Sequence, residues 1–243
     1  MRKKIIIGAP TANRGWVIRD WLNYIQGSFV DLRQDYDLSI ALVAAEDDPS
    51  VNIVYDFTQA MKYKFLLSVI EENKQDDIRD WKPERYKRMV YLRNLLLEVI
   101  RNENPDYFLS LDTDILLHRD CIRNLLQTLD SHEEAAAVGG KTFMTPTGTS
   151  CPSFGMFYEN QPSQGIRRQD TDGVFQVDII MAIKLMTPNA YNVDYEYHNC
   201  GEDLGWSAAC HDRGIKLWCD GRVANKHIME SNMLHKLDER CGF

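Results

Sequence analysis

Three short apolar runs, separated by segments of helical character, constrain the fold more than any other feature of the sequence. The runs cover Lys3 to Ile7, Leu38 to Ala45 and Tyr107 to Leu111. Strands that alternate with helices build mainly parallel sheets with helices on both faces. The sequence therefore predicts an α/β protein with a mainly parallel sheet.

The remaining elements follow from apolar periodicity and from the stop signals Gly and Pro. In the first half we expect helices at about Trp16 to Ile25, Phe57 to Glu72 and Arg85 to Arg101, with a loop from Gln75 to Pro83. In the second half we expect short strands at Ala135 to Val138 and Thr142 to Met144, a strand within Val174 to Lys184, a helix from Glu202 to Arg213 and a last strand from Lys216 to Cys219. No linker divides the chain, so residues 1–243 are predicted to form one domain with a front half (1–117) and a back half (118–243).

Composition and charge exclude several classes of protein. The chain is 44% hydrophobic and 26% charged, which is ordinary for a globular protein. No apolar run approaches the roughly 20 residues that cross a bilayer, and the N-terminus lacks a signal peptide, so we expect a cytoplasmic protein with no transmembrane segment. The six cysteines show no C-x-x-C spacing, which argues against structural zinc. A net charge of -8 argues against general affinity for nucleic acid.

Asp112-Thr113-Asp114 directly follows the apolar run that ends at Leu111. Two carboxylates at the end of a buried strand can hold Mg²⁺ or Mn²⁺, and ligands of open α/β sheets bind at the carboxyl ends of strands. Two other D-x-D patterns, Asp35/Asp37 and Asp170/Asp172, lie in turn-like surroundings. The sequence therefore predicts metal-assisted chemistry on a phosphorylated ligand at Asp112 and Asp114.

Arg93 falls in the middle of the apolar stripe of its predicted helix. A guanidinium stays charged, so in such a place it needs a carboxylate or a phosphate partner. One interpretation is an Arg–Asp pair that locks the helix to the sheet, and the other is a contact with a nucleotide diphosphate. Both hold if Arg93 bridges Asp112 and the ligand. The wheel places six residues within about 60° of Arg93: Tyr86, Met89, Val90, Leu96, Leu97 and Ile100.

Gly201-Glu202-Asp203 opens the last predicted helix. Acidic residues favour the first turn of a helix, where they meet free N–H groups and the helix dipole. The functional interpretation makes one carboxylate, Asp203 by preference, a general base for an acceptor hydroxyl. His227 follows the last predicted strand, where it is either structural or a third metal ligand beside the aspartates. The polar stretch from Phe154 to Asp172 is either a loop that closes over the ligand or a surface excursion.

The order of these motifs resembles that of the metal-dependent glycosyltransferases of the GT-A fold, which use nucleotide sugars. The likeness spans most of the chain, and its Arg93-Asn94 pair is similar to the fungal mannan-polymerase type, whereas the short chain is more like bacterial and phage members. The matching segments are Ile7 to Arg14, Tyr91 to Asn94, Leu111 to Asp114, Gly201 to Asp203, and His227.

This resemblance implies a Rossmann-like sheet, a nucleotide-sugar-binding front half and an acceptor-binding back half. Asp114 and His227 would bind Mn²⁺ or Mg²⁺, with Asp112 on the metal or the ribose. Asp203 would be the catalytic base of an inverting transfer, with Glu202 on the acceptor or its own helix. The nucleoside diphosphate, UDP before GDP, would lie against a larger set of residues: Pro10, Thr11, Asn13, Arg14, Glu46, Asp48, Arg93, Asp112 and Thr113.

Other functions remain open at the level of sequence. The acceptor could be a glycan, a lipid, a protein or a hydroxymethylated base of DNA. A nucleotidyltransferase would need a Gly-rich basic loop after the first strand, and Gly8-Ala9-Pro10-Thr11 is not one. The presence of Asp112, Asp114, Asp203 and His227 together argues against a non-catalytic module that binds sugar nucleotides or glycans.

Overall fold

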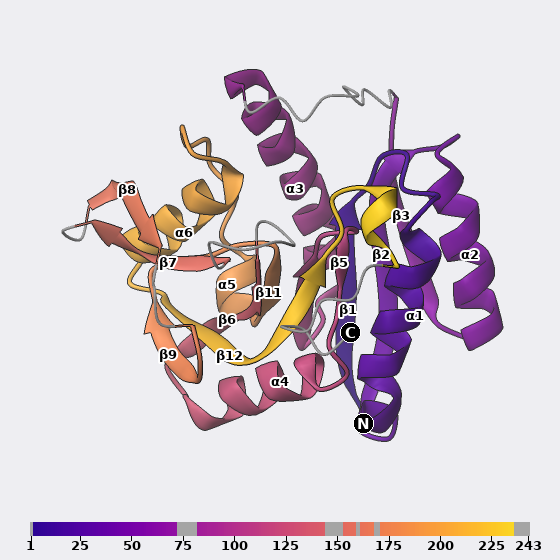
Figure 1. Cartoon of the computed structure of the whole chain (residues 1–243), viewed down its shortest axis with the longest axis horizontal. Helices are drawn as coiled ribbons and strands as arrows, with labels where there is room; N and C mark the ends of the chain where they lie inside the picture. Colours follow the sequence, from indigo (N-terminus) through magenta and orange to yellow (C-terminus); the bar gives the residue numbers. More distant parts are fainter. Residues whose placement is uncertain (1, 72–81, 144–152, 159–160, 168–170, 236–243) are drawn as a thin grey trace.

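The structure is a computed structural model that describes residues 2–71, 82–143, 153–158, 161–167 and 171–235, the backbone alone for 158 and 161–167 (Figure 1). Most of the predicted loop from Gln75 to Pro83, and Met144, lie outside these residues. The front half contains β1 (Lys3–Pro10), α1 (Ile18–Phe29), η1 (Val30–Leu32), β2 (Tyr36–Ala45), α2 (Pro49–Met61), β3 (Lys64–Ile70), α3 (Pro83–Glu103) and β4 (Tyr107–Leu111).

The back half is built from shorter strands and fewer helices. It contains β5 (Ile115–Leu116), α4 (Cys121–Ser131), β6 (Ala135–Thr142), β7 (Phe154–Tyr158), β8 (Gln161–Arg167), β9 (Val174–Val177), β10 (Ile179–Ile180), β11 (Ile183–Met186), α5 (Pro188–Tyr191), α6 (Glu202–Asp212), β12 (Lys216–His227) and η2 (Ser231–Met233).

In the described part of the chain, nine strands share one sheet with the order β3-β2-β1-β4-β11-β6-β12-β5, and β9 pairs with β12. Strands β1 to β4 are parallel, whereas β11 runs antiparallel between β4 and β6. Side chains of α1, α2 and α4 pack on one face, and those of α3, α5 and α6 on the other. The predicted mainly parallel sheet with helices on both faces is therefore confirmed.

The helix predicted from Phe57 to Glu72 is wrong. Helix α2 begins earlier, because the Asp48 side chain accepts the Ser50 N–H and Pro49 suits the first helical turn. It ends where Lys62 takes a left-handed conformation with φ of 58°. The apolar run that follows forms the edge strand β3, parallel to β2. Pairing with the buried strand β2 thus selects a strand instead of a helix for residues 64–70.

The second half also differs from expectation. The single strand predicted within Val174 to Lys184 is three short strands, β9, β10 and β11, and β10 belongs to a separate sheet with β7 and β8. The stretch from Phe154 to Asp172 is not a plain loop, since β7 and β8 pair antiparallel within it. Strand β6 is continuous to Thr142 instead of broken in two.

The last strand is much longer than predicted, and its length matters for the site. Strand β12 runs parallel to β6, shifts register between Asp220 and Ala224, and then pairs antiparallel with β5. The prediction that the strand stops at Cys219 is therefore wrong, and His227 is its last residue. His227 lies opposite Ile115, the residue after Asp114. The Ile228 N–H donates to the Asp114 carbonyl at 2.7 Å, so the register of β12 against β5 places His227 close to Asp114.

No helix within the described ranges is both long and apolar enough to cross a membrane.

Helix α6 approaches the preceding loop so closely that only glycine fits at position 205. A Cβ there would lie 1.9 Å from the Glu196 carbonyl oxygen. We expect Gly205→Ala to lower the free energy of unfolding by at least about 1–3 kcal/mol, the usual cost of overpacking. Urea unfolding followed by circular dichroism measures this. Gly27→Ala is the matched control, because a Cβ there meets nothing within 4 Å and alanine favours a helix; equal stability of the two variants would contradict the packing argument.

Candidate active site

The buried guanidinium of Arg93 joins α3 to the end of β4. Its side chain is 2% exposed, with Nη2 2.5 Å from Asp112 Oδ1 and Nη1 donating to Ser110 Oγ at 3.2 Å. Its Nε lies 3.7 Å from Glu202 Oε1 on α6. Burial alone would lower the pKa of Arg93, but Asp112 raises it well above its usual range. The predicted Arg–Asp pair is therefore present, and it reaches a second carboxylate.

Asp114 and His227 meet as the strand register requires. His227 Nε2 lies 3.6 Å from Asp114 Oδ1, and both side chains are largely buried. His227 Nδ1 is 3.1 Å from the Phe143 carbonyl oxygen, which can only accept, so Nδ1 carries a hydrogen. In the neutral ring, Nε2 then presents its lone pair towards Asp114. A ring fixed in this way by a carbonyl is typical of histidines that ligate metals.

Arg14 occupies the other side of the Asp114 carboxylate. Its Nη2 lies 3.4 Å from Asp114 Oδ2, and its backbone N–H donates to Ser50 Oγ at 3.2 Å. Arg14, on the loop after β1, thus places its positive charge beside Asp114, the second aspartate of the D-x-D sequence. Two of the three predicted metal ligands, Asp114 and His227, are therefore together, whereas the Asp112 carboxylate is engaged by Arg93. Among the residues that the structure describes, no three His, Cys, Asp or Glu side chains gather in a way that could hold a metal.

The residues predicted for the nucleotide lie on the loops after β1, β2 and β4. Asp48 is buried, and its oxygens accept the N–H groups of Asn13 at 2.6 Å and Ser50 at 2.8 Å, so this carboxylate ties two loops together. Asn13 takes a left-handed φ of 52° there. Glu46, in contrast, is exposed and accessible to a ligand.

The remaining three residues of the predicted nucleotide pocket line the same edge. Pro10 ends β1 and is half-buried, and Thr113 is buried between the two aspartates. Thr11 is also buried, and its Oγ1 has no hydrogen-bond partner within the described part of the chain. A buried hydroxyl without a partner is costly, which favours a ligand atom beside it.

The acidic pair that opens α6 is held by a lysine that the sequence analysis did not single out. Lys184 of β11 is fully buried, and its Nζ lies 2.5 Å from Asp203 Oδ1. Burial would raise the pKa of Asp203, but Lys184 and then Arg93 lower it below its usual value. Lys184 is a charged residue inside the apolar run of β11. A charged residue among apolar ones is the same signal that identified Arg93 in the sequence.

Glu202 lies in a different electrostatic setting from its neighbour. Burial, followed by the negative charge of Asp203, raises the pKa of Glu202 to about 7, and Arg93 opposes the rise. The two adjacent carboxylates therefore differ: Asp203 is held as an anion, and Glu202 takes up a proton near neutral pH. Pairs of carboxyl groups whose environments separate their pKa values are typical of acid–base sites.

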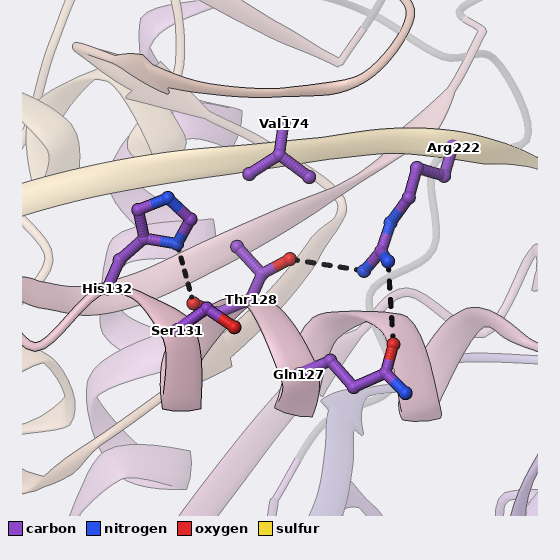
Figure 2. Close-up of a pocket in the computed structure, with 6 residues that line it drawn as sticks. All are labelled: Gln127, Thr128, Ser131, His132, Val174 and Arg222. Carbon is purple, nitrogen blue, oxygen red and sulfur yellow. Dashed lines mark hydrogen bonds between the residues drawn. The ribbon is translucent and has the colours of Figure 1, made fainter.

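A shallow pocket elsewhere, between α4 and β12, is not part of this constellation (Figure 2). Arg222 lies in it and is already bound by Asp220, at 2.6 Å, and by Thr128. None of the predicted site residues contributes to this pocket. Its lining consists of Gln127, Thr128, Ser131, His132, Val174 and Arg222.

Comparisons with known proteins agree with this architecture. No protein-family model and no curated protein matches the sequence. Among solved structures, a mannosyltransferase from Pyrobaculum calidifontis, in complex with GDP-Man and Mn²⁺, superposes with a TM-score of 0.59 at 13% identity over 95% of this chain and 58% of the other. Residues 1–349 of S. aureus TarS give 0.57 at 11% identity over 94% and 60%, and the same protein with UDP gives 0.56 at 12% over 95% and 61%.

The chain has the GT-A fold. The resemblance predicted this fold, and the superpositions confirm it. The chain spans about 60% of the length of these solved structures. In this fold, the loops after β1, β2 and β4 and the start of α6 are the parts that carry the candidate site described above.

The raised pKa of Glu202 predicts a pH dependence of stability. With a pKa of about 7 when folded and an ordinary value of 4.5 when unfolded, the carboxyl binds more protons in the folded state between these values. Its contribution to stability is therefore full below pH 4.5 and is lost as the pH rises through 7. Relative to Glu202→Gln, the wild type should lose on the order of 3 kcal/mol across this window, in urea unfolding at a series of pH values.

Glu98→Gln is the matched control, since Glu98 is exposed on α3. Its stability should follow that of the wild type at every pH. If the curves for the wild type and Glu202→Gln are parallel, the Glu202 carboxyl is not perturbed.

Proposed function

We propose that this protein is a glycosyltransferase that moves a sugar from a nucleoside-diphosphate sugar to an acceptor hydroxyl with inversion. The observation that carries the proposal is the meeting of Asp114, His227 and Arg14 at the carboxyl edge of a GT-A sheet. Glu46 and Thr11 lie on the neighbouring loops, where a nucleotide would be bound. The acceptor is a glycan, a lipid or a protein.

Asp114 and His227 supply two of the ligands that a divalent metal needs. Asp114 offers a carboxylate oxygen and His227 offers the Nε2 lone pair, and the Asp112 side chain is 32% exposed and accessible beside them. Mn²⁺ accepts this mixture of oxygen and imidazole ligands, and Mg²⁺ accepts the carboxylates. When bound, the metal would neutralise the negative charge that develops on the departing nucleoside diphosphate. Diphosphate oxygens would complete a coordination shell that the protein side chains alone leave incomplete.

The protein's own groups would then act on either side of the sugar. Arg14 would turn from Asp114 towards the diphosphate, because a metal on that carboxylate repels the guanidinium. Arg93 would hold Asp112 in place from within the core. On the acceptor side, one carboxylate of the pair Glu202 and Asp203 takes the proton of the attacking hydroxyl. The likeness to a mannosyltransferase solved with GDP-Man and Mn²⁺ and to TarS solved with UDP supports a nucleotide donor.

The experiment is calorimetric titration of UDP and GDP into the protein, with and without Mn²⁺. We expect micromolar binding that requires the metal, with UDP preferred. Asp114→Ala should weaken that binding by more than about 100-fold, since loss of a direct ligand costs at least as much as loss of a supporting partner.

Asp56→Ala, an exposed aspartate on α2, is the control and should bind as the wild type does. Absence of binding by either nucleotide with Mn²⁺ present would overturn the proposed function. Metal-dependent binding without any release of nucleotide from sugar donors would instead indicate a non-catalytic module that binds sugar nucleotides.

A further inference from the structure

Both oxygens of the Asp203 carboxylate are used within the protein. Oδ1 lies 2.5 Å from Lys184 Nζ, and Oδ2 accepts the Ala182 N–H at 3.3 Å. Lys184 is fully buried, with the rings of Tyr195 and Trp206 at 5.4 and 5.8 Å from its Nζ. A buried ammonium in such a shell depends on its counter-ion. Asp203 is therefore committed to an ion pair, and taking up a proton would break it.

The second oxygen of Asp203 stabilises an unusual turn beside the D-x-D sequence. Ala182 has a φ of 56°, a left-handed conformation that residues with a Cβ rarely adopt. Its carbonyl accepts the Asp112 N–H at 3.1 Å, and Trp21 Nε1 donates to the Asp112 carbonyl, also at 3.1 Å. Asp203 thus reaches the backbone of Asp112 through a single intervening residue. This is a positioning role.

Glu202 has no such commitment. Its nearest ionic partner in the described part of the chain is Arg93 Nε at 3.7 Å, and Arg93 is already paired with Asp112 at 2.5 Å. The side chain of Glu202 is 14% exposed, so solvent reaches it. The charged and titratable groups that face it are Tyr86, Arg93, Asp112 and Asp203.

Charge balance in this cluster points to the same residue. Arg93 and Lys184 carry two positive charges, and their partners Asp112 and Asp203 carry two negative ones. Ionised Glu202 adds a third negative charge to the two that Arg93 and Lys184 balance, so within these described residues a proton on Glu202 brings the cluster to neutrality. Burial of the Glu202 side chain raises its pKa to about 7, close to the value that suits a general base at neutral pH.

We infer that Glu202 is the base that takes the acceptor proton, and that Asp203, paired with Lys184, is a positioning residue for the D-x-D turn. The inference rests on the proposed glycosyl transfer. In that step the acceptor O–H bond breaks and its proton goes to the Glu202 carboxylate. The acceptor oxygen bonds to the anomeric carbon, whose bond to the diphosphate breaks, and the electron pair leaves with the nucleoside diphosphate.

The test compares Glu202→Gln with the double variant Lys184→Met/Asp203→Asn. The double variant removes both charges of the buried pair and leaves an amide oxygen for the Ala182 N–H. The assay is release of UDP or GDP from UDP-glucose, UDP-N-acetylglucosamine and GDP-mannose with Mn²⁺, with water as the acceptor. Binding of the same nucleotides by calorimetry is the second measurement.

Glu202→Gln should lose at least 100-fold in kcat while binding nucleotide and Mn²⁺ as the wild type does. It should also lose the acidic limb of the wild-type pH profile near 7. The double variant should lose nucleotide affinity, as expected for a positioning residue, but keep an acidic limb, moved to lower pH because the negative charge of Asp203 no longer raises the pKa of Glu202. Its kcat at saturating donor should fall by less than that of Glu202→Gln, since base catalysis, worth about 10²–10⁴, is retained. Asp203→Asn alone should be worse than the double variant, because it leaves Lys184 buried without its counter-ion.

A Glu202→Gln enzyme that keeps more than a tenth of kcat and the acidic limb would overturn the inference. So would a folded, nucleotide-binding double variant whose kcat at saturating donor falls as far as that of Glu202→Gln. If the double variant does not fold, the pH profiles of the wild type and Glu202→Gln decide alone. A wild type that neither binds nucleotide nor releases it from any donor overturns the proposed function itself, and the inference falls with it.

Discussion

The ion pair between Arg93 and Asp112 is the constraint on which the arrangement of the site depends. A guanidinium that is 2% exposed must have an anion, and the one that it has begins the D-x-D sequence. Helix α3 and the end of β4 are thereby fixed relative to each other. The loop beyond Asp112 then has little freedom, which places Asp114 where the last strand of the sheet brings His227.

A second buried pair repeats this arrangement at the start of α6. Lys184 and Asp203 join β11 to α6, and Ala182 links them to the backbone of Asp112. The two pairs lie on the same face of the sheet, and Arg93 contributes to the charge around both. The D-x-D turn and the start of α6 are therefore joined by one continuous network of side chains and backbone, so that a displacement of α6 would shift the D-x-D turn.

Sequence patterns predicted the fold and half of the candidate site, because the signals for these parts lie within single helices and strands. Apolar runs predicted β1, β2 and β4, and a charged residue on an apolar helix face predicted the Arg93 pair. The helix expected from Phe57 to Glu72 failed because pairing with β2 selects a strand for its second part. The role of Lys184 was missed, since its partner Asp203 lies on another element and only the folded sheet brings the two together.

The pairing of β12 with β5 constrains the order in which the two halves of the chain fold. Asp114 belongs to the first half of the chain and His227 to its last strand, so their approach requires closure of a long loop. Contacts of this kind form late in folding. The front half can thus adopt its parallel sheet before these two side chains meet. Under the proposed function, metal added to a refolding chain would stabilise the final docking of β12, because binding free energy becomes folding free energy for the element that completes a site.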